Sequence, residues 1–366
     1  MDRKTKLTIG AFLVVILIVG AAYYFLQRPE LYQKEVDSRN AQQGVTVVAE
    51  HLDTPWSIVF YNDIPLVSSR DTGQIFEVTE NGSVRSIGKV EDATHRGEGG
   101  LLGLAVKDSY LYAYYTTTMD NRVSRFALSG ERGSLSIDQP ETVVDELPAA
   151  GVHNGGRIAF GPDGMLYVTV GDAGDTSSAQ DKARLGGKIL RMTPEGEVPT
   201  DNPFQDSLVY SYGHRNPQGI AWGSDGTMYA TEFGQNTWDE LNIIRPGANY
   251  GWPNVEGGTD CEWNQDCLYA SPVQQWKTSE ASPSGVTFIE GTLYIANLRG
   301  AVLRAVTVSD IDTSRQYFSG EYGRIRDVAL APDGTLWFVT NNTDGRGRPS
   351  SSDDRIISVP LSALTD

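Results

Sequence analysis

A few short loops of this sequence hold the side chains that could carry out chemistry. The stretch GVHNGGR (151–157) contains His153, one of only four histidines in the chain. A neutral imidazole accepts a proton readily near working pH, which makes His153 a candidate general base. Because a lone histidine is more often structural, His153 has to be weighed together with the other loops. These are GEGGLLG with Glu98, YGHRNPQG with Arg215 and Asn216, ANLRG with Arg299, and GRIRDV with Arg324 and Arg326.

The spacing of these residues adds two points. If residues 324–328 form a strand, a spacing of two places Arg324 and Arg326 on the same face. The competing histidine, His214, sits directly beside Arg215, whose positive charge would lower its basicity. A further loop, TEFGQNTWDELN (231–242), supplies glycine, amides and acids.

A repeated strand–turn–strand unit would bring these loops together. Each copy has an apolar run, a short polar turn such as Asp-Gly, and a second run rich in Tyr, Val and Leu, which is a hairpin signal. Copies spaced by about 45 to 65 residues fit one four-stranded propeller blade each. The sequence therefore predicts an all-β fold, a six-bladed β-propeller over residues 45–366 whose post-hairpin loops gather at one end of the channel. The six copies lie at 57–78, 102–117, 157–174, 219–236, 285–300 and 327–345.

The N-terminus has a different composition. Residues 1–6 are basic, and Leu7–Leu26 is an uncharged, mostly apolar run. As a helix, such a run of about 20 residues spans roughly 30 Å, one hydrocarbon core. The sequence therefore predicts a transmembrane anchor at 7–26 with residues 1–6 in the cytoplasm, a polar linker at 27–44 and an extracytoplasmic propeller. A cleaved signal peptide is the alternative.

The net charge and the cysteine content narrow the possible classes of protein further. The formal net charge is −17, and no basic stretch offsets it, which excludes broad nucleic-acid binding. The two cysteines, Cys261 and Cys267, lie in the short loop CEWNQDC. In an exported protein this spacing predicts a local disulfide.

Taken together, the motifs resemble the soluble quinoprotein glucose and aldose sugar dehydrogenases. Those enzymes are six-bladed propellers that use pyrroloquinoline quinone (PQQ) and calcium. The resemblance implies PQQ-dependent oxidation of aldose sugars at C1 to lactones, with the electrons passed to an external acceptor such as the respiratory chain. It extends from about residue 45 to 360 and rests on GEGGLLGLA, HNGGRIAFGPDGMLYVTVGD, YSYGHRNPQGIAW, DELNIIRPGANYGWP and GRIRDVALAPDGTLW.

The resemblance also implies a role for each site residue. It makes His153 the general base and places Arg215 near the quinone oxygen, where a fixed cation stabilises developing negative charge. The PQQ carboxylates require a local positive site in this acidic chain, which arginines provide through bidentate contacts. The implied cofactor-binding residues are Glu98, Arg215, Asn216, Arg299, Arg324 and Arg326.

Calcium is the second implied cofactor. In the family, main-chain carbonyls of the loop that matches Gly234 and Gln235 bind the ion beside the quinone, and calcium accepts such oxygen ligands readily. The resemblance also suggests a second, structural calcium near Glu240 and Tyr250.

Three positions depart from the glucose dehydrogenase pattern. Glu98 stands where the pattern has glutamine, and Phe233 stands where it has another glutamine. Val152 replaces the aspartate that precedes the histidine, so His153 lacks that orienting partner. Glu98 is the candidate replacement, and the departures bear on substrate preference more than on reaction class.

Two functions from other classes compete with this interpretation. A calcium-dependent lactonase or esterase on a similar propeller would need a carboxylate-rich channel, and Arg324 and Arg326 count against it. A non-catalytic propeller that binds carbohydrate or protein would tolerate the loss of His153, Arg215 or the arginine pair, yet all are present.

Overall fold

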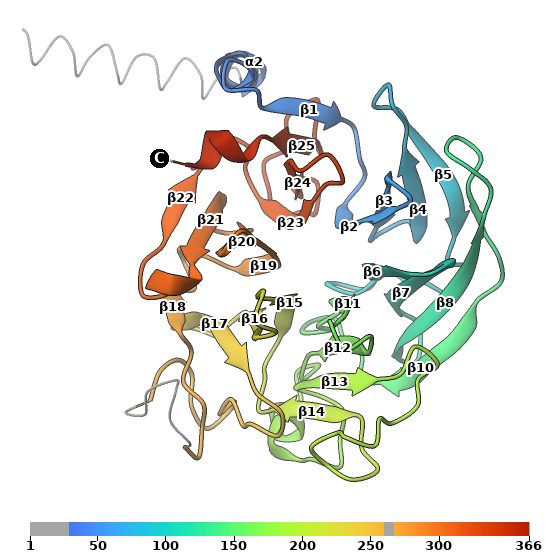
Figure 1. Cartoon of the computed structure of the whole chain (residues 1–366), viewed down its shortest axis with the longest axis vertical. Coiled ribbons are helices and arrows are strands. Elements are labelled where there is room, and N and C mark those ends of the chain that lie inside the picture. The colour runs from blue at the N-terminus through green and yellow to red at the C-terminus, as the bar shows by residue number, and fades with distance from the viewer. Residues whose placement is uncertain (1–28, 260–266, 366) are drawn as a thin grey trace, which may run out of the picture.

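Six antiparallel sheets stand around a central axis in the computed structural model, which describes residues 29–259 and 267–365 (Figure 1). This arrangement confirms the predicted all-β, six-bladed propeller. Blade one comprises β2 (Pro55–Tyr61), β3 (Ile64–Ser69), β4 (Gln74–Val78) and β5 (Val84–Lys89). Blade two comprises β6 (Leu101–Lys107), β7 (Tyr110–Thr116), β8 (Asn121–Ser129) and β10 (Glu141–Leu147), with β9 (Ser136–Ile137) paired to β8. Blade three comprises β11 (Ile158–Phe160), β12 (Leu166–Val170), β13 (Lys188–Met192) and β14 (Val209–Tyr212).

The remaining blades follow the same order, with one exception that closes the ring. The outer strand of blade six is β1 (Thr46–Ala49), which pairs antiparallel with β25 (Ile356–Val359), so the two ends of the propeller share one sheet. Blade four comprises β15 (Pro217–Trp222), β16 (Met228–Glu232), β17 (Trp238–Ile244) and β18 (Gln274–Lys277). Blade five comprises β19 (Pro283–Ile289), β20 (Thr292–Asn297), β21 (Val302–Thr307) and β22 (Arg315–Tyr317). Blade six comprises β23 (Ile325–Leu330), β24 (Leu336–Thr340), β25 and β1.

The Asp-Gly turns predicted from the sequence join the inner two strands of several blades. Gly164, Gly226 and Gly334 adopt positive φ angles of 78°, 84° and 83°, which glycine tolerates without a Cβ clash. In the first of these turns, the Asp163 carboxylate accepts a hydrogen bond of 3.1 Å from the Met165 N–H. These turns form from local contacts alone, which explains why the sequence signals them clearly.

The hydrophobic core lies between the faces of neighbouring blades. One cluster joins Leu102 and Tyr112 of blade two to Ile158 and Leu166 of blade three. Because both faces of a middle strand are covered, β12 is buried at every position rather than at alternate ones. The packed blades hold the loops at the ends of the inner strands in fixed positions.

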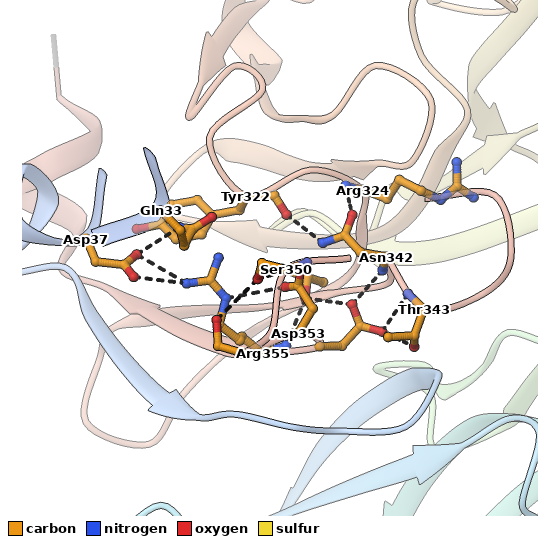
Figure 2. Close-up of polar contacts among 12 residues, drawn as sticks. Gln33, Asp37, Tyr322, Arg324, Asn342, Thr343, Ser350, Asp353 and Arg355 are labelled. Atoms are coloured by element: carbon orange, nitrogen blue, oxygen red, sulfur yellow. Dashed lines mark hydrogen bonds and ion pairs between the residues drawn. The ribbon is translucent and has the colours of Figure 1, made fainter. Parts of the chain in front are cut away.

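Residues within the predicted linker 27–44 form a helix that packs against the propeller. Helix α2 (Pro29–Ala41) lies beside β1 at the outer side of blade six (Figure 1). Val36 of α2 is buried in the apolar cluster of that blade. Arg355 donates hydrogen bonds of 3.2 Å to both carboxylate oxygens of Asp37 (Figure 2), and the Asn40 amide donates to the Tyr322 hydroxyl over 3.0 Å.

Asp37 is expected to stabilise the folded protein through Arg355. The Arg355 side chain is fully buried, and its other carboxylate partner, Asp353, is more distant at 3.4 Å. We expect Asp37→Ala to lower the free energy of unfolding by about 1–3 kcal/mol, because the buried cation loses its nearest carboxylate partner. Urea denaturation measures the change. Glu35→Ala is the matched control, since Glu35 is exposed on the same helix; an equal loss in both variants would contradict the assignment.

The structure corrects the predicted localisation. Among residues 29–259 and 267–365, no helix is both long enough and apolar enough to cross a membrane. Helix α2 has 13 residues, and a helix of that length rises about 20 Å, against a hydrocarbon core of about 30 Å. The segments 1–6 and 7–26 lie outside the described residues. The prediction of a membrane-anchored protein with an extracytoplasmic propeller is therefore not retained.

The cysteine loop is only partly described. Cys261 lies outside the described residues, so its pairing with Cys267 stays a prediction.

Candidate functional site

Loops from all six blades line a small cavity of about 30 Å³, the arrangement expected at one end of a propeller channel. Arg324 and Arg326 of blade six both line it, as does Glu98, which precedes β6. His153 lies next to Asn154, a further lining residue. The other lining residues are Trp56, Arg70, Gly155, Gln218, Phe233, Leu298, Asp344 and Arg346.

His153 is oriented by a buried carboxylate. Its Nδ1 lies 2.7 Å from Oδ1 of Asp172, whose side chain is fully buried, whereas the His153 side chain is 18% exposed. The second oxygen of Asp172 accepts a hydrogen bond of 2.8 Å from the Trp252 indole N–H. With Nδ1 facing a carboxylate, the imidazole carries its proton there and leaves Nε2 free to accept another.

Asp172 is ionised in this setting. Burial alone would raise its pKa, but hydrogen bonds from His153, the Gly174 N–H and Trp252 outweigh burial and lower the pKa below its ordinary value. Asp172 was not predicted from the sequence, where Glu98 was the candidate replacement for the aspartate lost at Val152. The available signal was the loop GDAGD (171–175), which directly follows the hairpin that His153 precedes.

Glu98 does not orient the imidazole of His153, which was the role predicted for it. Its Oε2 accepts a hydrogen bond of 3.0 Å from the main-chain N–H of His153, not from the imidazole. Its Oε1 accepts one of 2.9 Å from Arg346. Burial would raise the pKa of Glu98, but these two partners lower it overall. Glu98 therefore fixes the backbone of the candidate base and links it to a residue of blade six.

Arg326 is a buried cation without a carboxylate partner among the described residues. Its guanidinium lies over the Trp56 ring, 4.9 Å from the centroid, and donates to the neutral oxygens of Gln218 at 3.0 Å and Ser284 at 3.2 Å. Its Nε has no partner. Burial, reinforced by the positive charge of Arg70, holds the pKa of Arg326 well below its ordinary value. An anionic ligand would relieve this charge.

The other two arginines predicted to bind PQQ carboxylates, Arg324 and Arg299, have surroundings unlike those of Arg326. Arg324 pairs with Asp344 at 2.9 Å, and its main-chain N–H donates to Asn342 at 2.9 Å. Arg299 does not line the 30 Å³ cavity but is exposed in a larger neighbouring pocket, which Arg324 also lines. The structure thus brings Arg324 and Arg326 to the cavity and Arg299 to its rim.

Arg215 lies beside the His153–Asp172 pair. Its main-chain carbonyl accepts a hydrogen bond of 2.8 Å from the Asp172 N–H, and its guanidinium lies 5.5 Å from the centroid of the Trp252 ring. The guanidinium also donates to the Phe233 carbonyl at 3.2 Å, while its Nε has no partner. Burial lowers the pKa of Arg215, although Asp172 and Glu232 oppose that shift.

Asn216 supports the neighbouring loop. Its Oδ1 accepts hydrogen bonds from the Gly155 N–H at 3.0 Å and from the Gln218 amide at 3.1 Å. A contact of Asn216 with a cofactor would therefore come from its amide NH₂ group.

His214 has the geometry of a structural histidine. It is fully buried, and its two ring nitrogens lie 2.8 Å from Ser211 and 2.8 Å from Glu232. Its ring stacks on Tyr250 with a centroid distance of 4.6 Å. Since both nitrogens are engaged inside the protein, His214 cannot receive a substrate proton without losing a buried hydrogen bond.

The loop after β16 could present carbonyl oxygens to a calcium ion. The Gly234 N–H donates to Asp239 at 2.9 Å, and the Gln235 N–H donates to Glu256 at 2.8 Å. No main-chain hydrogen bond to the carbonyl oxygens of Gly234 or Gln235 is found in the part of the chain that the structure describes. Their amides are thus anchored, which leaves the carbonyls available as hard oxygen ligands.

Glu240 and Tyr250, the residues named for a second calcium, are both engaged in hydrogen bonds within the protein. The two Glu240 oxygens accept hydrogen bonds from the Gly257 N–H and the Asn242 amide, at 2.8 and 2.9 Å. The Tyr250 hydroxyl donates to the Ile243 carbonyl at 2.7 Å. Within residues 29–259 and 267–365, no group of three or more His, Cys, Asp and Glu side chains could hold a metal. The second calcium near Glu240 and Tyr250 therefore stays a prediction.

Comparison with known proteins gives a consistent result. Residues 52–349 match the family described as glucose/sorbosone dehydrogenase, so the match begins after helix α2. The chain is 29% identical over 343 residues to aldose sugar dehydrogenase YliI of Escherichia coli, covering 83% of this chain and 92% of that protein.

Two solved structures share the fold closely. The PQQ-bound form of an aldose sugar dehydrogenase from Streptomyces coelicolor superposes with a TM-score of 0.81 at 45% identity, covering 86% of this chain and 97% of that one. A putative glucose dehydrogenase from Thermus thermophilus gives a TM-score of 0.78 at 40% identity, over 86% and 99% of the two chains.

Proposed function

The chain belongs to the glucose/sorbosone dehydrogenase family, and on that premise we propose that it is a PQQ-dependent aldose sugar dehydrogenase. It oxidises the C1 hydroxyl of an aldose to the lactone. Bound PQQ supplies the two-electron acceptor that takes the hydride, and an external acceptor then removes the electrons.

One observation carries this proposal most directly. Arg326, a buried cation without a carboxylate partner among the described residues, lines the same cavity as Glu98, which holds the main chain of the candidate base His153. A cation buried without a counter-ion costs several kcal/mol, so a ligand carboxylate is the natural compensation. PQQ carries three carboxylates, whose negative charge matches the cluster formed by Arg324 and Arg326.

His153 performs the proton transfer in the proposed mechanism. Its Nε2 accepts the proton of the C1 hydroxyl, while Asp172 at 2.7 Å from Nδ1 stabilises the imidazolium that forms. Glu98 holds the main chain of His153, and Trp252 holds Asp172, so the base keeps one orientation. Arg215 provides a fixed positive charge beside this pair for the negative charge that develops during oxidation.

The same loops would hold the cofactors. Arg324 and Arg326 would bind PQQ carboxylates, with Arg299 at the rim, Asn216 as an amide donor and Glu98 in the lining of the same cavity. The carbonyl oxygens of Gly234 and Gln235 would bind calcium, whose charge would polarise a nearby oxygen.

The lactonase alternative fits the cavity less well. The cavity lining contains four arginines, Arg70, Arg324, Arg326 and Arg346, against the two acids Glu98 and Asp344. Both acids already pair with arginines, at 2.9 Å in each case. This excess of positive charge suits an anionic cofactor better than a carboxylate-bound calcium.

Reconstitution of the purified protein tests the proposed function. With PQQ, calcium and glucose, we expect the protein to reduce an artificial dye, and we expect chelation of calcium before reconstitution to prevent activity. Methyl glucoside is the matched control, because its C1 oxygen is blocked. No dye reduction with any free aldose, or equal rates with methyl glucoside, would contradict the proposal.

A further inference from the structure

A second, larger pocket adjoins the cofactor cavity and has a volume of about 490 Å³. It shares Leu298, Arg324 and Arg346 with that cavity, so the two spaces are neighbours with a common wall. We call it the rim pocket and define it by Tyr32, Gln33, Arg299, Arg324, Arg346 and Arg348. Its volume lies in the range of small-molecule sites, about 300–1,000 Å³.

The rim pocket carries an excess of positive charge. Arg324 and Arg346 have carboxylate partners in Asp344 and Glu98. In the described part of the chain, no ion pair involves Arg299 or Arg348, although both are exposed in a protein of net charge −17. Unpaired arginines converging on one concave surface create a local positive potential.

The two acids that line the rim pocket are engaged by other groups. Glu321 pairs with Arg39 at 2.6 Å and accepts a hydrogen bond from Asn40 at 2.8 Å. Asp353 accepts a hydrogen bond of 2.8 Å from the Ser350 N–H and faces Arg355 (Figure 2). Neither acid therefore neutralises Arg299 or Arg348.

Buried contacts fix the walls of the rim pocket. Helix α2, which supplies Tyr32 and Gln33, is held by the contact between Asp37 and Arg355 (Figure 2). On the opposite side, the Asn342 amide donates to the Tyr322 carbonyl at 2.9 Å, and its oxygen accepts from the Arg324 N–H. A preformed pocket loses little entropy when a ligand binds.

Glu98 links the rim pocket to the candidate base. The two oxygens of Glu98 contact the His153 N–H at 3.0 Å and Arg346 at 2.9 Å. One carboxylate thus separates the main chain of the base from a guanidinium of the rim pocket. A hexose with its C1 hydroxyl at His153 could place its far end near these arginines.

We propose that the rim pocket is a substrate subsite for the negatively charged group of an anionic aldose, a carboxylate or phosphate remote from C1. This inference rests on the proposed function and names a substrate class for the same site. The guanidinium groups supply charge-assisted hydrogen bonds to the anion. Tyr32 and Gln33 supply a ring face and an amide to the sugar.

The test compares two sugars that differ only in charge, D-glucuronate and its neutral amide, D-glucuronamide. The PQQ- and calcium-loaded protein should have a higher kcat/KM for glucuronate, and added salt should reduce that preference. Arg348→Ala should lower the preference by roughly 5–10-fold, the effect of losing one partly exposed charge-assisted hydrogen bond. Arg315→Ala is the matched control, an exposed arginine on outer strand β22 that should keep the preference.

Two binding measurements show whether Arg348 binds the anionic group of the sugar or a carboxylate of PQQ. Calorimetric titration of the loaded protein with glucuronate, carried out with the PQQ already reduced so that no turnover occurs, should show weaker binding in Arg348→Ala. A PQQ titration shows whether Arg348 instead serves a cofactor carboxylate. Weaker PQQ binding with an unchanged sugar preference would overturn the subsite, as would equal use of the two sugars by the wild-type protein. Absence of any sugar oxidation would count against the proposed function, while the calorimetric result would still decide the subsite.

Discussion

Replacing His153 with Gln is expected to lower the rate at which sugar reduces bound PQQ by at least about 10²-fold, the usual lower contribution of a positioned general base. Glutamine keeps a polar side chain of similar size but cannot accept the proton from the C1 hydroxyl. The variant should still bind PQQ and calcium, because His153 is a ligand of neither in the proposed site. Anaerobic stopped-flow mixing with sugar measures the reduction step apart from electron transfer to the acceptor.

Two further variants sharpen this prediction. Asp172→Asn should also slow reduction, since the amide cannot stabilise the imidazolium that forms 2.7 Å away. His51→Gln is the control, because His51 is an exposed histidine that does not line the cavity. A His153→Gln protein that reduces PQQ at nearly the wild-type rate would show that the base lies elsewhere.

Replacing Arg326 with Gln is expected to weaken PQQ binding by about 1.5–3 kcal/mol, the contribution of a charge-assisted hydrogen bond. The cation is buried over Trp56 and has no carboxylate partner among the described residues, so its charge remains available to a ligand. Arg326→Lys should recover only part of the affinity, because lysine lacks the planar fork that matches a carboxylate. Fluorescence titration of the apoprotein with PQQ in calcium buffer measures the affinity.

The chain offers a closely matched control for Arg326. Arg304 is also buried, lies over Trp276 with a distance of 4.7 Å to the ring centroid, and has a Nε without a partner. It does not line the cofactor cavity. Arg304→Gln should therefore alter stability without changing PQQ affinity. If both variants lost the same affinity, the effect of Arg326 would be one of folding and the cofactor assignment would fail.

The sequence by itself determined the propeller and most of the candidate site. The Asp163–Gly164 hairpin and its counterparts form through contacts between residues close in the chain, so local patterns were sufficient to predict the blades. The loops that follow them carry short motifs around His153, Arg215 and Arg326. These motifs were specific enough to indicate the family and the chemistry that the comparisons support.

Only the tertiary structure decided which groups meet in space. The partner of His153 is Asp172 rather than Glu98, because pairing of β11 with β12 brings the two ends of that hairpin together. Arg326 lacks a carboxylate partner among the described residues because of where the acidic side chains of the folded chain lie, and no local pattern contains that information.

Long-range contacts account for the remaining differences. Arg346 reaches Glu98 across 248 positions of the sequence, and Asp37 reaches Arg355 across 318. The contact between Asp37 and Arg355 holds helix α2 against blade six, although the sequence of this polar segment resembles that of a linker. Such contacts depend on closure of the ring by the pairing of β1 with β25. This pairing joins residues near opposite ends of the chain, so the spacing of residues in the sequence does not predict it.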